Sequence, residues 1–182
     1  MKLKLTLIIA LSVFTTCVFA QAKKGSLIGI HFNLADFKAP SGIKDPVSGK
    51  VYSSIKEMNQ GFSLSYWKGL TNKIDFSAKA NAMFYSKEEG VKDDAQIALE
   101  LEPTLNIRPF SDAAKIAPFL TTGVGVGYYT GNFGAYIPAG VGLQLNCSSA
   151  TYFFVQAQYR FTLTKKEFGD NLLYSFGIAE HF

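Results

Sequence analysis

The stretch "IALELEPTLNIRPF", residues 97 to 110, alternates apolar and polar side chains along most of its length. An extended chain points successive side chains to opposite faces, so leucine and isoleucine share one face while Glu100, Glu102 and Arg108 share the other. In a soluble sheet the apolar face would be the core, whereas in a membrane barrel it would face lipid and the charges would face the lumen. The rest of the chain must decide between these two arrangements.

Seven further segments have the same period of two, and no segment after the N-terminal run sustains a helical period. An even number of strands lets an antiparallel sheet close with both chain ends on one side of a membrane. The sequence therefore predicts an all-β fold: an eight-stranded antiparallel up-and-down transmembrane β-barrel with a polar lumen filled by side chains. The eight segments are 26–37, 61–70, 73–86, 95–108, 116–130, 135–147, 151–163 and 172–182, and a long connection spans 36–60.

Three features favour lipid on the apolar face. Each segment runs for about ten residues, the length that a tilted strand needs to cross a membrane. Glycines at 123, 125, 127, 140 and 142 lie on the polar face, where they make room for bulky lumenal neighbours, and a serine at 125 is expected to fit. Aromatic residues gather near the segment ends, as interfacial girdles require. These are Tyr66, Trp67, Phe84, Tyr85, Tyr128, Phe161, Tyr174 and Phe182.

The first twenty residues have the layout of a signal peptide: basic Lys2 and Lys4, an apolar run from Leu5 to Val18, and a small residue at Ala20. We expect cleavage after residue 20, which leaves 21–182 as one β-barrel domain. The predicted location is the outer membrane of a Gram-negative cell. Without the two lysines the formal net charge of +4 falls to +2, and no large basic cluster remains, so nucleic acid is not an expected partner. Cys147 would be the one cysteine left, which excludes an internal disulfide.

Charged residues recur on the predicted lumenal face. The interior of an eight-stranded barrel is just wide enough for side chains to fill, so these charges must be paired and an open pore is not expected. A hairpin of the third and fourth segments would bring Lys79 close to Glu102 and Asp75 close to Arg108. An ion or proton pathway is the alternative to a satisfied polar network. The predicted lumenal polar network is Asp75, Lys79, Glu100, Glu102, Arg108 and Arg160.

Catalytic chemistry has few candidates. A lipid hydrolase would need a histidine beside a serine and a carboxylate, and the chain has only His31 and His181, both at inward positions. No spacing typical of metal ligands occurs. We therefore expect that the protein is not an enzyme and has no cofactor and no metal site. We interpret both histidines as packed or solvated.

The N-terminal signal, the eight segments, "EPTLNIRPF" and the C-terminal "YSFGIAEHF" resemble the small outer-membrane β-barrel family of Gram-negative envelopes, the OmpA-type and PorT-like eight-stranded barrels. The resemblance is one of pattern and covers nearly all of residues 21–182. It implies that outer-membrane lipid and the outer-membrane assembly machinery are partners, with envelope proteins as further candidates. It also implies a C-terminal assembly signal, from which Glu180 departs because an apolar residue is usual there. The residues of this signal are Tyr174, Phe176, Ile178 and Phe182.

The function that these patterns predict is that of a non-enzymatic envelope component with no open pore. Its role would be structural, adhesive or accessory to secretion, through its outer loops or partners. Two alternatives stay open at this point: a secreted soluble barrel that binds a small apolar ligand, as lipocalins do, and a hydrolase that acts on outer-leaflet lipid.

Overall fold

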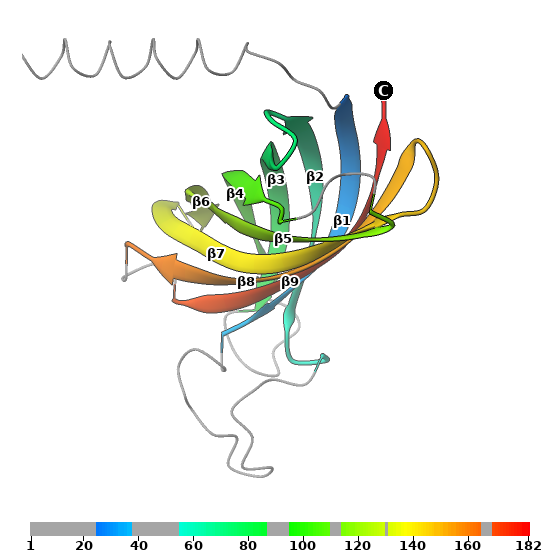
Figure 1. Ribbon diagram of the computed structural model, residues 1–182. Coiled ribbons are helices and arrows are strands. Elements are labelled where there is room, and N and C mark those ends of the chain that lie inside the picture. The colour runs from blue at the N-terminus through cyan, green and yellow to red at the C-terminus, as the bar shows by residue number, and fades with distance from the viewer. Residues whose placement is uncertain (1–24, 38–54, 87–94, 110–113, 130, 165–168) are drawn as a thin grey trace, which may run out of the picture.

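A computed structural model describes residues 25–37, 55–86, 95–109, 114–129, 131–164 and 169–182. The predicted signal peptide, 1–20, lies outside these residues, as does most of the 36–60 connection. The described chain consists of β-strands joined by turns (Figure 1). The strands are β1 (Ser26–Asp36), β2 (Asn59–Gly69), β3 (Ile74–Ser86), β4 (Ala95–Ile107), β5 (Ile116–Gly123), β6 (Gly125–Tyr129), β7 (Asn132–Asn146), β8 (Thr151–Thr162) and β9 (Asn171–His181).

The strands close into an antiparallel barrel and pair in sequence order, except that β5 and β6 do not pair with each other. β1 pairs with β2 on one side and with β9 on the other, so the first and last strands complete the ring. β5 and β6 both lie between β4 and β7, and together they form one wall position. The wall therefore has eight spans, which confirms the predicted eight-stranded up-and-down barrel.

The fifth span is divided into β5 and β6 at Val124, and the cause lies in the neighbouring strands. The register places Pro103 of β4 opposite Val124 and Pro138 of β7 opposite Gly123. A proline has no N–H to donate, so the ladder loses a hydrogen bond on both sides at this point. The pairings Thr122↔Ala139 and Gly125↔Tyr136 keep one register across the break, so no residue is inserted.

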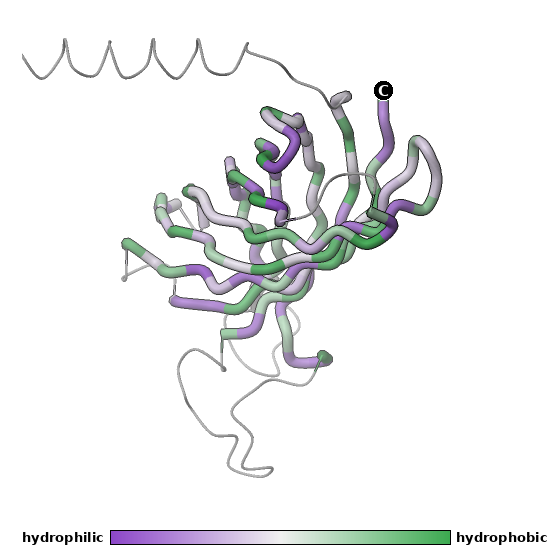
Figure 2. The backbone as a smooth tube through the Cα atoms, viewed as in Figure 1, coloured by the Kyte–Doolittle hydropathy of each residue, from purple (hydrophilic) through white to green (hydrophobic). Residues whose placement is uncertain are grey.

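Side chains alternate between the two faces of the wall as the sequence predicts. Figure 2 shows the resulting alternation of hydrophilic and hydrophobic residues along the strands. Large apolar side chains are exposed on the outside, with Ile30 61% and Leu64 62% accessible, while Glu102 and Asn106 are fully buried inside. The barrel is thus apolar outside and polar within, the reverse of a soluble protein.

The two ends of the barrel differ in their connections. We call the end where β1 begins and β9 finishes the terminal end, and the opposite end the loop end; the C-terminus lies beside the start of β1 in Figure 1. At the terminal end, residues 70–73 and 147–150 form short turns closed by backbone hydrogen bonds, such as Cys147 N–H to Thr151 O at 3.1 Å. Within the described residues, no helix is long and apolar enough to cross a membrane.

Candidate functional site

All six predicted charged residues lie in the lumen of the barrel. β3 contributes Asp75 and Lys79, and β4 contributes Glu100 and Glu102. Arg108 directly follows β4, and Arg160 lies on β8. Every one of them is buried, although all six side chains are ionisable. Their accessible fractions are Asp75 2%, Lys79 1%, Glu100 5%, Glu102 0%, Arg108 2% and Arg160 1%.

Arg160 is the centre of this network. Its guanidinium crosses the lumen from β8 to β4, where Nη1 donates to Glu100 Oε2 at 2.9 Å and Nη2 to Glu102 Oε2 at 2.7 Å. The ring of Tyr136 lies 4.7 Å from the guanidinium carbon, within the range of a cation–π contact. The Tyr136 hydroxyl donates to Glu102 at 3.1 Å and lies 3.2 Å from Glu100. One cation and one hydroxyl therefore bridge both carboxylates.

A chain of amides continues the network across β8 to β3. Gln158 donates to Glu102 at 2.9 Å, and Gln156 donates to Gln158 at 2.9 Å. Lys79 in turn donates from its ammonium to the amide oxygen of Gln156. Lys79 is opposite Glu102 in the β3–β4 register, as the sequence predicts. The hydrogen bonds of Glu102, however, go to Arg160, Gln158 and Tyr136, which sequence register could not reveal because these residues lie on other strands.

The second predicted pair lies nearer the terminal end. Arg108 forms an ion pair with Asp75 and lies two residues along the chain from Asn106, the backbone partner of Asp75. Hydroxyl and amide groups follow it along the lumen: Ser77 and Thr104 lie 2.7 Å apart, and Asn106 donates to Ser77 at 2.9 Å. The hairpin geometry that the sequence predicts for Asp75 and Arg108 is therefore present.

Apolar clusters lie in the lumen on both sides of the charged network. Near the terminal end the cluster comprises Leu27, Trp67, Phe119, Phe154 and Ala179. Near the loop end it comprises Ala35, Met83, Tyr85, Ala98 and Leu173. In the first cluster Trp67 stacks on Phe154 with ring centroids 4.6 Å apart. Arg160 and the two glutamates that it contacts are therefore flanked along the barrel axis by packed hydrocarbon, whereas the Asp75–Arg108 pair lies at the terminal end.

These clusters correct part of the predicted aromatic girdle. Trp67 and Tyr85 are 3% and 7% accessible and point into the lumen, so they are not interfacial residues. Tyr85 instead donates to Glu100 at 3.3 Å. By contrast, Tyr128 and Phe161 are 44% and 49% accessible on the outer wall, where the girdle prediction placed them. A position near a strand end predicts the depth of a residue in the membrane. Only the alternation along the strand predicts which face of the wall its side chain occupies.

The two histidines lie in different surroundings. His31 Nε2 is 2.7 Å from Ser65 Oγ, which also accepts a hydrogen bond from Trp67 at 3.1 Å. Both His31 and Ser65 are buried at 3% accessibility. His181 is held at the terminal end by the Tyr152 hydroxyl at 3.0 Å. Within the described ranges neither ring has a hydrogen bond to a carboxylate, and no group of three or more metal-binding side chains occurs.

Glycines on the lumenal face make room for aromatic rings, as predicted, but the fit is tighter than the sequence indicates. A Cβ atom at Gly125 would overlap the ring of Tyr136, and one at Gly142 would overlap Phe119. The Tyr136 ring cannot easily move, because it contacts Arg160 and both carboxylates. The expectation that serine fits at 125 is therefore wrong.

Gly125→Ala should lower the free energy of unfolding by about 1 to 3 kcal/mol, the usual cost of overpacking. Urea titration of the refolded protein, followed by the fluorescence of its single tryptophan, measures this loss. Gly169→Ala is the matched control, because a Cβ there would make an ordinary contact of 3.7 Å with Phe37. Equal stability of both variants would contradict the tight packing of Tyr136.

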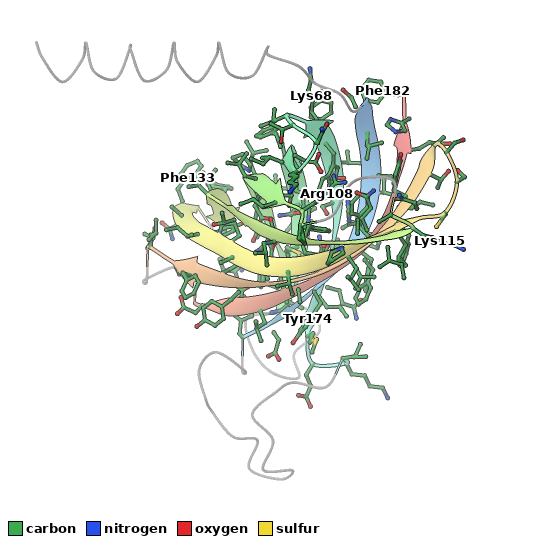
Figure 3. The ribbon with its side chains drawn as sticks, viewed as in Figure 1. Lys68, Arg108, Lys115, Phe133, Tyr174 and Phe182 are labelled. Carbon is green, nitrogen blue, oxygen red and sulfur yellow. The ribbon has the colours of Figure 1, made fainter. Side chains whose placement is uncertain are left out.

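The C-terminal strand presents the predicted assembly residues on its outer face. Phe176, Ile178 and Phe182 are 40%, 48% and 75% accessible. The Phe182 ring lies 6.4 Å from that of Tyr66 on β2, beyond β1. Tyr174 follows the same outward parity, and so does Glu180, which is exposed. Figure 3 shows Phe182 at the terminal end and Tyr174 toward the other end of β9.

Comparison with known proteins gives likeness in structure only. No family model matches the sequence. No curated protein matches it either. Among solved structures, Neisserial surface protein A (NspA) has a TM-score of 0.57 at 14% identity, over 87% of this chain and 98% of that one. The attachment invasion locus protein Ail of Yersinia pestis has a TM-score of 0.54 at 16% identity, over 87% and 99%. The outer membrane protein OprG of Pseudomonas aeruginosa has a TM-score of 0.54 at 12% identity, over 87% and 96%.

Each of these likenesses spans almost the whole of the solved chain. At such low identity the likeness concerns the fold and not the activity. The likeness in fold agrees with the closed eight-span ring, the apolar outer wall and the polar lumen. The chain has the fold of the small eight-stranded outer-membrane β-barrels.

Proposed function

We propose that this chain is an integral outer-membrane protein with a closed lumen, which acts as a non-enzymatic component of a Gram-negative envelope. The observation that carries the proposal is the inverted polarity of the barrel. Leu99 and Leu101 are 58% and 52% accessible on the outer wall, while Glu100 between them is 5% accessible. Lipid stabilises this arrangement, because without it the apolar side chains of the outer wall would be exposed to water.

The proposal includes export and assembly. Residues 1–20 would direct the chain out of the cytoplasm and be removed. The outward aromatic residues of β9 and the terminal Phe182 would then be recognised by the outer-membrane assembly machinery. OprG, one of the structural neighbours, is an outer membrane protein by its name. In this orientation the terminal end, with its short turns, faces the periplasm and the loop end faces the outside.

The two alternatives fit the lumen less well. A lipocalin-like barrel needs an apolar interior for its ligand, whereas this lumen contains Arg160, Lys79 and two glutamates in one hydrogen-bonded network. A lipid hydrolase needs a serine and histidine that substrate can reach, whereas the Ser65–His31 pair is buried beside Trp67. We therefore assign a structural, adhesive or secretion-accessory role to the connections at the loop end and to partners that bind there.

Membrane insertion can be tested directly on the mature protein. After refolding it should float with lipid vesicles in a density gradient and resist extraction by carbonate or urea. It should also migrate differently on gels before and after boiling, because a closed barrel has no edge strand from which to unfold. Recovery in the soluble fraction, with no effect of boiling, would contradict the membrane assignment and favour the soluble alternative.

A second measurement tests the closed lumen. In planar bilayers the wild-type protein should give conductance at background level, because the side chains of the Arg160 network fill the lumen between two apolar clusters. Glu102→Gln should leave that background unchanged. A steady wild-type conductance that this substitution abolishes would show that the charges line an ion pathway.

A further inference from the structure

The ladder between β4 and the fifth span of the wall, which consists of β5 and β6, is interrupted near its middle; we call this boundary the seam. β4 pairs with β6 over 99–101 and with β5 over 104–107, so Glu102 and Pro103 fall outside both ladders. By contrast, the ladder between β3 and β4 runs without a break over 95–107 of β4. β4 is therefore held more weakly on the side of the fifth span than on the side of β3.

Pro103 accounts for the missing backbone bond at the seam. The N–H of Val124 donates to the carbonyl oxygen of Pro103 at 3.2 Å. In an antiparallel ladder the two residues of such a pair exchange two hydrogen bonds, one from each N–H. Proline has no N–H, so Pro103 cannot return the bond. One backbone hydrogen bond therefore joins this pair where a regular ladder would have two.

Polar side chains of β4 do not replace the missing bond. The inward positions 123, 125 and 127 of the fifth span are all glycine, so no side chain there can pair with those of β4. Thr104 and Asn106 of β4 bond instead to Ser77 of β3, at 2.7 and 2.9 Å. Asn106 Oδ1 and its registered neighbour Thr121 Oγ1 each have no hydrogen-bond partner among the described residues. These side chains strengthen the contact with β3 and leave the seam unsupported.

Tyr136 of β7 bridges the seam from the lumen. Its ring lies over Gly125 of β6, where a Cβ atom would overlap it, and its hydroxyl donates to Glu102 Oε2 of β4 at 3.1 Å. The register pairs Tyr136 with Gly125, and Glu102 follows Leu101, the last residue of β4 that pairs with β6. The phenol therefore crosses one whole strand and reaches β4 at the gap in the ladder. Because Tyr136 is 3% accessible, water does not compete for this bond.

We propose that the seam is the part of the wall that opens while the rest of the barrel stays folded, and that Tyr136 is the latch that holds it shut. Local opening of this kind starts where few hydrogen bonds and few packed side chains must be broken. Arg160 and Gln158 also bond to Glu102, but they do so from β8, across the lumen, and do not join β4 to β6. The proposal goes beyond the envelope role and does not depend on it, because the ladder and the latch both lie within the barrel.

Amide hydrogen exchange tests the seam in the refolded protein in detergent micelles, read residue by residue by NMR. Successive residues of a strand direct their N–H groups to opposite neighbours. Because Pro103 accepts from Val124, the N–H of Leu101 points to β6, whereas those of Glu100 and Glu102 point to β3. We call the amides of Leu101 and Val124 the seam amides, and those of Glu100 and Glu102 the β3-facing amides.

The two sets of amides lie at the same depth in the wall, so solvent access is matched between them. Relative to their rates in unfolded peptides, the seam amides should exchange about five- to tenfold faster than the β3-facing amides. This is the effect of the one hydrogen bond that Pro103 cannot make. Equal protection of the two sets in wild type would overturn the seam.

Tyr136→Phe tests the latch, because it removes the hydroxyl and keeps the ring over Gly125. It should speed exchange of the seam amides by about a further tenfold, the effect of losing one hydrogen bond to a charged group, and leave the β3-facing amides unchanged. Tyr152→Phe is the matched control, because the Tyr152 hydroxyl bonds to His181 at the terminal end. It should not change exchange at the seam.

Two results with Tyr136→Phe would overturn the latch. Unchanged exchange of the seam amides would mean that the hydroxyl does not hold the seam. An equal rise in exchange of the seam amides and the β3-facing amides would mean that the substitution weakens the whole barrel rather than one boundary of its wall.

Discussion

Arg160→Met should lower the free energy of unfolding by about 3 to 5 kcal/mol, the loss expected when one partner of a buried ion pair is removed. The substitution leaves Glu100 and Glu102 in the lumen without the guanidinium that donates to both of them. Urea titration in lipid vesicles measures this loss. The fluorescence of Trp67 reports unfolding, because its ring is stacked on Phe154 in the folded barrel.

The rescue of this variant tests the cause. Adding Glu100→Gln to Arg160→Met should recover much of the stability, since the remaining buried carboxylate, Glu102, then has the charge of Lys79 opposite it in the β3–β4 register. Lys68→Met, which removes a partly exposed cation from β2 near the terminal end, is the matched control and should change stability by less than about 1 kcal/mol. If the double variant were no more stable than Arg160→Met alone, the loss would come from packing rather than from unpaired charge.

The alternation in sequence was sufficient to predict the wall of the barrel. In a strand the period of two fixes the face of every residue once one face is known, so the inward position of Lys79, Glu102 and Arg108 follows from the residues alone. The hairpin between β3 and β4 then brings Asp75 and Arg108 together. Local register and face are properties of neighbouring strands, and a sequence with strong alternation determines both.

Contacts across the lumen do not follow from the sequence in the same way. Arg160 and Glu102 are 58 residues apart, on strands that do not pair, and their contact depends on barrel diameter and strand tilt. The same holds for the stacking of Trp67 on Phe154. The break between β5 and β6 likewise depends on two prolines that only the finished register places beside Val124.

Val124→Arg should destabilise the protein in bilayers by about 2 to 4 kcal/mol, because the side chain points outward near the middle of its span and would place a charge in hydrocarbon. Val124 is 57% accessible and lies between β5 and β6, far from both ends of the barrel. The same substitution at Ile116, the first residue of β5, should cost at most about 1 kcal/mol, because an interfacial arginine can reach water. Urea unfolding in vesicles compares the two variants with wild type.

The comparison between these two positions is more informative than either loss alone. Ile116 and Val124 are equally accessible at 57%, so a barrel surrounded by water would tolerate arginine equally well at both. Only a hydrocarbon layer around the middle of the wall makes the cost depend on depth. Val124→Ile keeps the surface apolar and should be as stable as wild type whether lipid or water surrounds the barrel. Equal stability of Val124→Arg and Ile116→Arg in vesicles would mean that lipid does not cover the wall at Val124, and the membrane assignment would be wrong.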